Sequence, residues 1–280
     1  MVYGVAWPVL RIGSHLTQPL WFGTARLFIA SLTMFIVLGL SGRFRWPSRS
    51  DLPAILSVGI CMLGFYAVFV QVALAHIGAG RGSLLGYTTP LWVTPVAIFV
   101  FGEHMTRLKA LGLSLGLGGL VVLFNPLQFD WSDREVVFGN GLCLAAALAW
   151  SVAILQIRVH RYRLTPLELS PWQMLTGAIV CLVAFLVFEG RQEFEWSIEA
   201  VLVLSFAGPI ASGIAVFFTT SAMRLLPSLT VSIWLLGVPL LSLLISVSFL
   251  GERLTASLGA GLALILGGLA AMAVAEARRR

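Results

Sequence analysis

Polar aromatic residues inside long apolar runs are the groups in this sequence most able to do chemistry. Tyr66 and Tyr87 lie in two such runs, and Trp150 lies in a third. A tyrosine surrounded by hydrocarbon needs a hydrogen-bond partner for its hydroxyl group, so it tends to face the interior of a helical bundle. We therefore expect Tyr66, Tyr87 and Trp150 to line an internal site where a small molecule stacks on their rings.

The composition indicates that most of the surface around these residues faces lipid. Of 280 residues, 59% are apolar and 11% are charged, and the mean hydropathy is +0.96. Ordinary soluble domains are about 45–50% apolar and about 25% charged. So few charged side chains cannot cover a soluble fold of this length. The composition therefore argues against a globular cytosolic enzyme and excludes a disordered chain.

A second group of residues could complete the binding site. It consists of Tyr3, Trp92, Trp234, His76 and Arg26. His76 is either a proton-accepting group or an interfacial histidine bonded to a carbonyl group. Arg26, about two turns into an apolar run, could hold a substrate carboxylate, bond to carbonyl groups, or extend to the lipid headgroups.

Two prolines are the candidate hinges. Pro90 and Pro239 each lie midway along an apolar run. Each removes one backbone hydrogen bond and frees the carbonyl group four residues earlier. In lipid such a break is tolerated only where protein or water meets the freed group. The two prolines therefore mark either a binding site or a kink that shapes the bundle.

The sequence predicts no catalytic residues, no metal site and no cofactor. All twelve carboxylates fall in loops or at the ends of apolar runs, so none offers a proton relay at mid-membrane. There is no HExxH, GxSxG, P-loop or CxxC pattern. Cys61, Cys143 and Cys181 lie in apolar runs and are interpreted as packing residues.

Ten apolar segments would form the helices that position these residues. Most have about 19–23 residues, enough to cross a hydrocarbon core about 30 Å thick. Short connections make neighbouring helices antiparallel, so we predict an all-α membrane protein with ten transmembrane helices. The segments are Val2–Gly13, Leu20–Leu40, Leu52–Leu74, Ser83–Phe101, Ala110–Phe124, Phe138–Ile157, Trp172–Phe188, Ala200–Ala222, Ser228–Leu250 and Ala256–Ala275.

The chain repeats itself at a nearly constant offset. Gly102-Glu103 returns as Gly251-Glu252, 149 residues later, and Pro90 and Pro239 have the same offset. Each copy would hold five helices. Because five is odd, the two copies would lie upside down relative to each other in the membrane, which is an architecture of transporters.

The repeat predicts the domain boundaries. Residues 1–124 form the first five-helix repeat, 125–137 a connecting loop, and 138–280 the second, inverted repeat with a basic tail. In the second copy about 12 residues precede the mate of Tyr3, and in the first copy only 2 do. We therefore expect the N-terminal part of the first helix to be missing, unless that helix is short by nature.

The basic residues predict the orientation in the membrane. They fall in short loops and at the tail, a distribution typical of membrane topology rather than nucleic-acid binding. Twelve of the 18 fall on one side if the first helix starts in the cytoplasm, and five fall on the other. The bias predicts a multi-pass protein of the plasma membrane (the inner membrane of a bacterium) with both termini cytoplasmic.

The ordered markers resemble one known family. The sequence is similar to the EamA-type branch of the drug/metabolite transporter superfamily across essentially its whole length. The residues that carry the resemblance are Tyr3-Gly4 (Trp-Gly is usual in the family), Arg26 in Thr24-Ala25-Arg26-Leu27, Thr89-Pro90-Leu91, Phe101-Gly102-Glu103-His104-Met105-Thr106, its echo Phe249-Leu250-Gly251-Glu252-Arg253-Leu254-Thr255, Gly118-Gly119 and Gly267-Gly268.

The resemblance implies ten helices in two halves and transport of small metabolites through a central cavity by alternating access. Aromatic residues near the presumed cavity make the amino-acid exporters the most similar branch. Carriers of other metabolites (nucleotide-type, vitamin or drug) remain alternatives, as do an intramembrane enzyme or lipid-modifying protein and a structural or sensory subunit. The expected partners are a small-molecule substrate and the lipid bilayer, without nucleic acid, in a monomer or weak homodimer. The missing buried acid favours facilitated transport.

Overall fold

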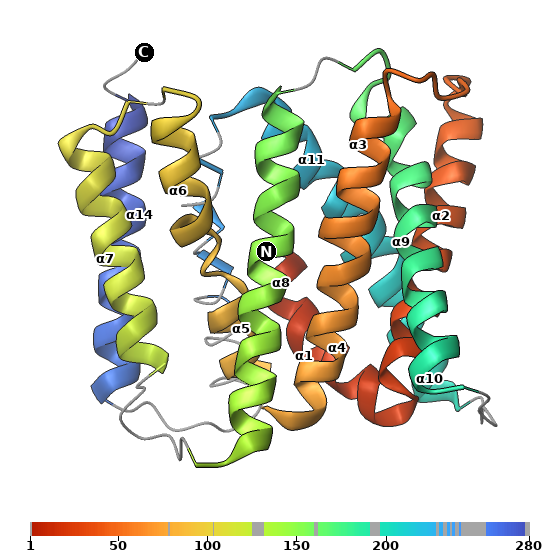
Figure 1. Cartoon of the computed structure of the whole chain (residues 1–280), viewed down its shortest axis with the longest axis horizontal. Helices are drawn as coiled ribbons and strands as arrows, with labels where there is room; N and C mark the ends of the chain where they lie inside the picture. The colour runs from red at the N-terminus through yellow and green to blue at the C-terminus, as the bar shows by residue number, and fades with distance from the viewer. Residues whose placement is uncertain are drawn as a thin grey trace.

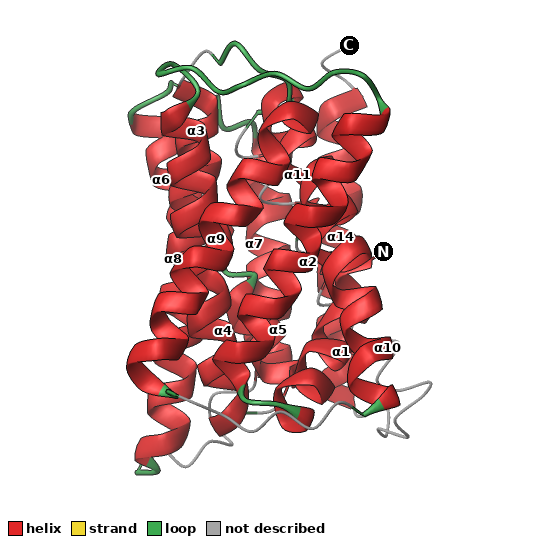
Figure 2. Cartoon of the chain, turned by 90° about the vertical axis from the view of Figure 1, so that its right-hand side faces the viewer, coloured by secondary structure: helices red, strands yellow, loops and turns green. Residues whose placement is uncertain are grey.

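The computed structural model of the chain is a bundle of helices. It describes residues 2–77, 79–102, 104–124, 132–159, 162–190, 197–227, 230–231, 234–235, 237–238, 241 and 256–277. All secondary structure in these ranges is helical, which confirms the all-α prediction. The helices run between two ends of the molecule, where the loops lie (Figure 2).

The elements follow the predicted apolar runs closely. They are α1 (Val2–Leu16), α2 (Pro19–Leu40), α3 (Leu52–Leu56), η1 (Ser57–Phe65), α4 (Tyr66–His76), α5 (Ala79–Gly86), α6 (Thr89–Phe99), α7 (Arg107–Phe124), α8 (Arg134–Val159), α9 (Pro166–Phe188), α10 (Ile198–Phe206), η3 (Ala207–Ile214), α11 (Ala215–Leu225) and α14 (Ala256–Ala277). Figure 1 shows their arrangement. Most of the predicted run Ser228–Leu250 lies outside the described residues.

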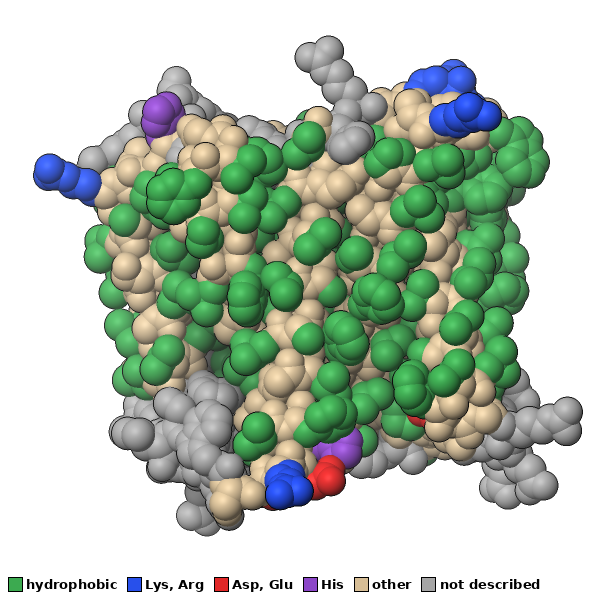
Figure 3. All heavy atoms as spheres, viewed as in Figure 1, with side chains coloured by type: hydrophobic (Ala, Val, Ile, Leu, Met, Phe, Trp, Pro, Cys, Tyr) green, Lys and Arg blue, Asp and Glu red, His purple; other side chains and the backbone are tan. Residues whose placement is uncertain are grey.

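Five helical segments of the described chain are long and apolar enough to cross a membrane. They are Pro19–Leu40, Leu52–His76, Arg134–Ile157, Pro166–Phe188 and Ile198–Leu225. On the face in Figure 3, charged side chains lie at the two ends and hydrophobic side chains cover the region between them. This distribution suits a bilayer, whose interior excludes charge.

Polar residues at the loop ends define where several helices begin. Thr165 precedes α9 and forms a capping box with Glu168: the Glu168 carboxylate accepts the Thr165 backbone N–H at 2.7 Å, and Thr165 Oγ1 accepts the Glu168 N–H at 3.4 Å. Thr106 precedes α7, and its hydroxyl oxygen accepts the Lys109 N–H at 3.3 Å. These bonds satisfy backbone donors that a helix leaves unpaired in its first turn.

Two long spans contain a π-helical stretch. The span Leu52–His76 is α-helical at both ends and π-helical through η1, and the span Ile198–Leu225 is interrupted in the same way by η3. A Cβ atom added at Gly59 of η1 would lie 2.5 Å from Thr176 Cβ, and one at Gly208 of η3 would lie 2.7 Å from Ile29 Cγ2. Glycine therefore lets α9 approach η1 and lets α2 approach η3.

The pair α2–α9 is fastened by a carboxylate at one end. The Glu189 carboxylate, just beyond α9, accepts the backbone N–H of Leu20 at 2.9 Å and that of Trp21 at 3.2 Å. Both donors belong to the first turn of α2, which has no side-chain cap of its own. Glu189 therefore joins the end of α9 to the start of α2.

Asp51, which precedes α3, joins the start of that helix to the α8–α9 loop. Its Oδ1 accepts the backbone N–H of Arg163 at 2.9 Å and that of Leu164 at 3.1 Å, and its Oδ2 accepts the Ser48 hydroxyl at 2.6 Å. Burial raises the pKa of the Asp51 carboxyl group, but the hydrogen bonds from Ser48 and from the α8–α9 loop lower it by more. The pKa of Asp51 therefore lies below its ordinary value.

The pair α7–α14 lies at one edge of the bundle (Figure 1). A Cβ atom added at Gly112 would lie 2.9 Å from the Gly268 carbonyl oxygen, and one at Gly119 would lie 2.8 Å from that of Gly261. The two backbones therefore touch at two places along antiparallel helices. Small residues permit such close approach between membrane helices.

The structure corrects the position of Pro90 within its helix. The run is interrupted at Tyr87–Thr88, and Pro90 is the second residue of α6 rather than a residue midway along one helix. Proline suits this place because the first turn needs no backbone N–H donor there. The break, not a kink, therefore separates α5 from α6. Pro239 lies outside the described residues.

Candidate functional site

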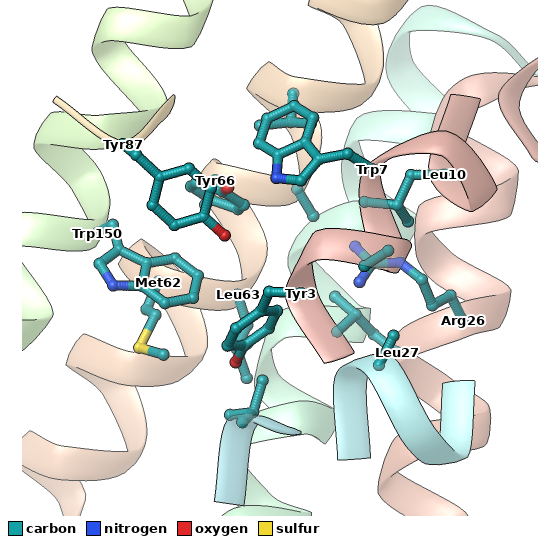
Figure 4. A pocket seen from close by; sticks show the side chains of 15 residues that line it. Tyr3, Trp7, Leu10, Arg26, Leu27, Met62, Leu63, Tyr66, Tyr87 and Trp150 are labelled. Carbon is teal, nitrogen blue, oxygen red and sulfur yellow. The ribbon is translucent and has the colours of Figure 1, made fainter. Parts of the chain in front are cut away.

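A cavity lies within the bundle and is lined by α1, α2, η1, α4, α8, η3 and α11 (Figure 4). Five of the residues singled out in the sequence line it. They are Tyr3, Arg26, Tyr66, Tyr87 and Trp150. Its volume, measured over positions open to the centre of a water molecule, is about 40 Å³. That is room for a few water molecules.

Aromatic rings form one wall of the cavity. The Tyr66 and Trp150 ring centroids are 4.7 Å apart, and those of Tyr3 and Trp150 are 6.2 Å apart with the ring planes at 83°. Trp7 and Tyr87 form a further edge-to-face pair at 6.2 Å. Figure 4 shows these five rings around one space. Rings from four separate segments of the chain thus present their faces and edges to a common volume.

Two of the tyrosine hydroxyl groups are held by partners. Tyr3 Oη lies 3.1 Å from Thr219 Oγ1 of α11, within hydrogen-bond distance. The Tyr87 hydroxyl is hydrogen-bonded to the side chain of Trp7. The Trp150 indole nitrogen has no hydrogen-bond partner among the described residues, although Trp150 is only 6% exposed. It remains a donor available to water or to a ligand.

Arg26 is the charged residue of this cavity. Its guanidinium extends from α2 toward the rings (Figure 4), and Nη1 donates to Ser212 Oγ of η3 at 2.6 Å. Ser212 Oγ in turn donates to the Ala207 carbonyl oxygen at 2.8 Å. The Arg26 Nε atom is buried and has no hydrogen-bond partner among the described residues. The sequence left extension of Arg26 to the lipid headgroups open. In the structure its guanidinium instead contacts the Ser212 side chain across the bundle.

Trp7 is a cavity residue that the sequence analysis missed. It is 2% exposed and packs against α5, where a Cβ atom added at Gly82 or Gly86 would lie 3.2 Å or 3.1 Å from its ring. The two glycines, one turn apart, thus leave space for the indole. A signal was present, because Trp7 follows Tyr3 by four residues and therefore shares its helix face.

Three predicted site residues lie away from the cavity. His76, at the end of α4, lies with Nδ1 2.5 Å from the carboxylate Oε2 of Glu135 of α8. Trp92 is 37% exposed and Trp234 is 46% exposed, and neither lines the cavity. For Trp92 the reason is the break before α6, because the buried face of that helix carries Val93 and Ala97 instead.

The site can bind but carries no set of residues suited to bond cleavage. In the part of the chain that the structure describes, no group of three or more His, Cys, Asp and Glu residues could hold a metal ion. The cavity offers one guanidinium, several aromatic faces and an apolar remainder. A guanidinium binds carboxylates, and aromatic faces attract ammonium groups.

Comparison with known proteins identifies the class. Residues 1–125 and 137–274 match the model of the EamA-like transporter family. The chain therefore belongs to this family and is an integral membrane transporter, which confirms the resemblance seen in the sequence. A solved crystal structure shares the fold, with a TM-score of 0.76 at 22% identity, over 97% of this chain and 94% of that one.

Curated relatives carry transporter names. The chain is 27% identical over 269 residues to the uncharacterized transporter YoaV of Bacillus subtilis, a match over 96% of this chain and 92% of that protein. It is 24% identical to a probable amino-acid metabolite efflux pump of Salmonella typhimurium, over 96% of this chain and 90% of the pump. A probable terminal-alkyne amino-acid exporter of Streptantibioticus cattleyicolor is 26% identical, over 65% and 60% of the two chains.

Proposed function

We propose that the protein carries amino acids with apolar side chains across the membrane, in the direction of export, through the central cavity. The observation that carries this proposal is a guanidinium without a carboxylate partner among the described residues, facing a set of aromatic rings. A zwitterion matches these two features together. Its carboxylate would bind Arg26, and its ammonium group would lie against the ring faces of Tyr66 and Trp150.

The rest of the lining favours an apolar side chain on the substrate. Leu10, Leu27, Met62 and Val70 border the same space. The names of the amino-acid efflux pump and the amino-acid exporter among the relatives support this substrate class and the export direction. A nucleotide-type, vitamin or drug substrate is the alternative, and the substrate panel below distinguishes it.

The proposed mechanism is alternating access by two inverted five-helix repeats, residues 1–124 and 138–280. Contacts between α7 and α14 support it: Gly112 touches Gly268, and Gly119 touches Gly261. Adding the sequence offset of 149 to 112 and 119 gives 261 and 268. Exchanging the repeats therefore converts one contact into the other, as a two-fold axis in the membrane plane would.

The π-helical spans give independent support for the repeat. Gly59 touches Thr176, and Gly208 touches Ile29. The offset of 149 relates the two glycines, and an offset of 147 relates Ile29 to Thr176. The family model also matches in two ranges that divide close to the predicted connecting loop. The proposal includes ten helices and a location in the plasma membrane with both termini in the cytoplasm. The arrangement of the two repeats and the distribution of basic residues in the loops support it.

The cavity must widen for transport. Ligand sites are commonly about 300–1,000 Å³, and the present cavity admits only a few water molecules. Relative movement of the two repeats would open it to one side at a time. Tyr87, in the break between α5 and α6, lies where such a movement needs little backbone rearrangement, because no helical hydrogen bonds cross the break from α5 into α6.

Counterflow in proteoliposomes tests the substrate. Vesicles preloaded with unlabelled L-leucine should accumulate labelled L-leucine, and chromatography should recover the label unchanged. L-leucinamide lacks the carboxylate and 4-methylpentanoate lacks the ammonium group. Each should compete at least about tenfold more weakly than unlabelled leucine, because each lacks one of the two charged groups that contact the site. Equal competition by leucinamide, or flux only with vitamins, nucleotides or drugs in the panel, would contradict an amino-acid site. A modified product would indicate an enzyme.

Variants test which residues form the site. Tyr66→Ala and Tyr87→Ala should each weaken leucine counterflow by about tenfold, since each removes an aromatic face from the cavity. Trp92→Ala is the matched control, because Trp92 is an exposed aromatic residue outside the cavity. If both tyrosine variants transport leucine like the wild type, the site assignment is wrong.

A further inference from the structure

The charge of Arg26 has no carboxylate partner in the described chain, because the acidic residues near the bundle are engaged elsewhere. Glu135 pairs with His76 and Glu168 with Arg45. Two further carboxylates, Glu189 and Asp51, accept backbone N–H groups, as described above. The partner that Arg26 has is the neutral hydroxyl of Ser212.

The surroundings of Arg26 make this charge costly when the cavity is closed and empty. About 40 Å³ of space holds too few water molecules to hydrate a guanidinium fully. An unpaired charge in a protein interior is strongly unfavourable, whereas a paired and hydrogen-bonded one is tolerated. The carboxylate of a bound substrate would supply that pair and remove much of the cost.

The residue equivalent to Arg26 in the second repeat is neutral, so the repeat does not add a second guanidinium to the cavity. Gln173 corresponds to Arg26 at the offset of 147. Its Nε2 donates to the Ala54 carbonyl oxygen at 3.2 Å. One guanidinium thus calls for one carboxylate in each passage through the closed state.

We propose, on the basis of the function proposed above, that this transporter is an exchanger: it changes its open side faster with a carboxylate-bearing substrate bound to Arg26 than it does empty. Loaded transporters pass the closed state with Arg26 paired. Empty transporters pass it with Ser212 as the hydrogen-bond partner of Arg26 among the described residues. Release of substrate on one side is therefore followed faster by uptake of another carboxylate there than by return of the empty protein.

Efflux from proteoliposomes measures this difference. Vesicles loaded with labelled L-leucine are diluted into chloride-free buffer, with or without unlabelled L-leucine outside. We expect external leucine to accelerate the efflux of label about tenfold or more, since a difference of one charged contact changes a rate by at least that factor. Measurable efflux at equal rates in both buffers would overturn the exchanger and leave the proposed function standing. Absence of flux with every amino acid tested would refute the proposed function instead.

Two variants separate the role of Arg26 from general damage. Arg26→Lys keeps the charge and should keep the acceleration, whereas Arg26→Gln should bring the two efflux rates together. Ser212→Ala removes the partner of the empty state, so it should slow efflux into leucine-free buffer more than exchange and raise their ratio. Ser221→Ala is the matched control, because the Ser221 hydroxyl bonds to the Phe217 carbonyl oxygen of its own helix. An unchanged ratio in Ser212→Ala would also overturn the proposal, even if the Arg26 variants lose all transport.

Discussion

The pairs α2–α9 and α7–α14 each bring two antiparallel helices together, but different interactions join them. The Glu189 carboxylate joins the end of α9 to the start of α2, and Ser31 Oγ of α2 donates to the Pro171 carbonyl oxygen of α9 at 2.9 Å. The α7–α14 contacts are backbone approaches at glycine, such as Gly112 against Gly268. The charged hydrogen bonds of the α2–α9 pair lie at a helix end, the neutral Ser31–Pro171 bond lies within the pair, and the glycine contacts lie along the apolar part of α7 and α14. Charged groups thus join helices at their ends, and neutral hydrogen bonds or small residues join them in the apolar part.

Adding a methyl group at the α7–α14 glycine contact should lower the stability most. In Gly268→Ala the new methyl group would lie 2.7 Å from the Gly112 carbonyl oxygen, so one backbone must move. We expect the free energy of unfolding to fall by about 2 kcal/mol. Labelling of the buried Cys143 and Cys181 thiols during heating in detergent measures it. Gly118→Ala is the control, because nothing lies within 4 Å of an added Cβ there. Equal loss in both variants would refute close packing as the cause.

Asp51 should come next, with a pH dependence that identifies it. Asp51→Asn replaces an acceptor of backbone and hydroxyl hydrogens with a group that carries its own donors, which should cost about 1–3 kcal/mol. The pKa of Asp51 is lower in the folded protein. Its stabilisation is therefore complete above about pH 4 and is lost as the pH falls through the folded-state value.

Melting curves of the wild type and Asp51→Asn should accordingly differ by a constant amount near neutral pH and converge in acid. Asp133→Asn is a suitable control, since Asp133 is exposed and accepts N–H groups only from its own helix start. A difference that grows in acid would show that the sign of the pKa shift is wrong.

Glu189→Gln should have the smallest of these effects. The amide oxygen can still accept one N–H from the first turn of α2, so we expect a loss of about 0.5–1.5 kcal/mol. The exposed Glu199, in the first turn of α10, provides Glu199→Gln as a control. If Glu189→Gln is as damaging as Asp51→Asn, the amide oxygen does not replace the carboxylate as an acceptor, and the prediction is wrong.

Hydropathy and spacing predicted most of the helices and five of the cavity residues. Polar groups in hydrocarbon have few places to go, so Tyr3, Tyr66 and Arg26 could be assigned to the interior without knowledge of the fold. The prediction that Trp92 lines the site is wrong because it depended on the course of the backbone. Trp92 was assigned by its closeness to Pro90 in the sequence, and the break at Tyr87–Thr88 changes the direction in which the following residues face.

Packing details lay beyond the sequence. A glycine in an apolar run does not reveal which helix it touches, and the structure brings Gly112 against Gly268 of the same chain. The π-helical stretches were not predicted. The residues of η1 are apolar on every face of the helix, so they show no periodic pattern that would indicate its pitch. Trp7 was not predicted, although it lies one helical turn after Tyr3 on the same face.

The π-helical stretch η1 determines the direction in which the side chain of the following residue points. Tyr66 is the first residue after η1, and each residue of an α-helix turns the chain by about 100°. A π turn accommodates one residue more than the α-helical pattern allows. Deleting a single residue from Ser57–Phe65 would rewind this stretch and swing the Tyr66 ring off Trp150 by roughly a quarter of a revolution. The wide turn thus sets a fixed rotation between the two α-helical parts of one span, α3 and α4.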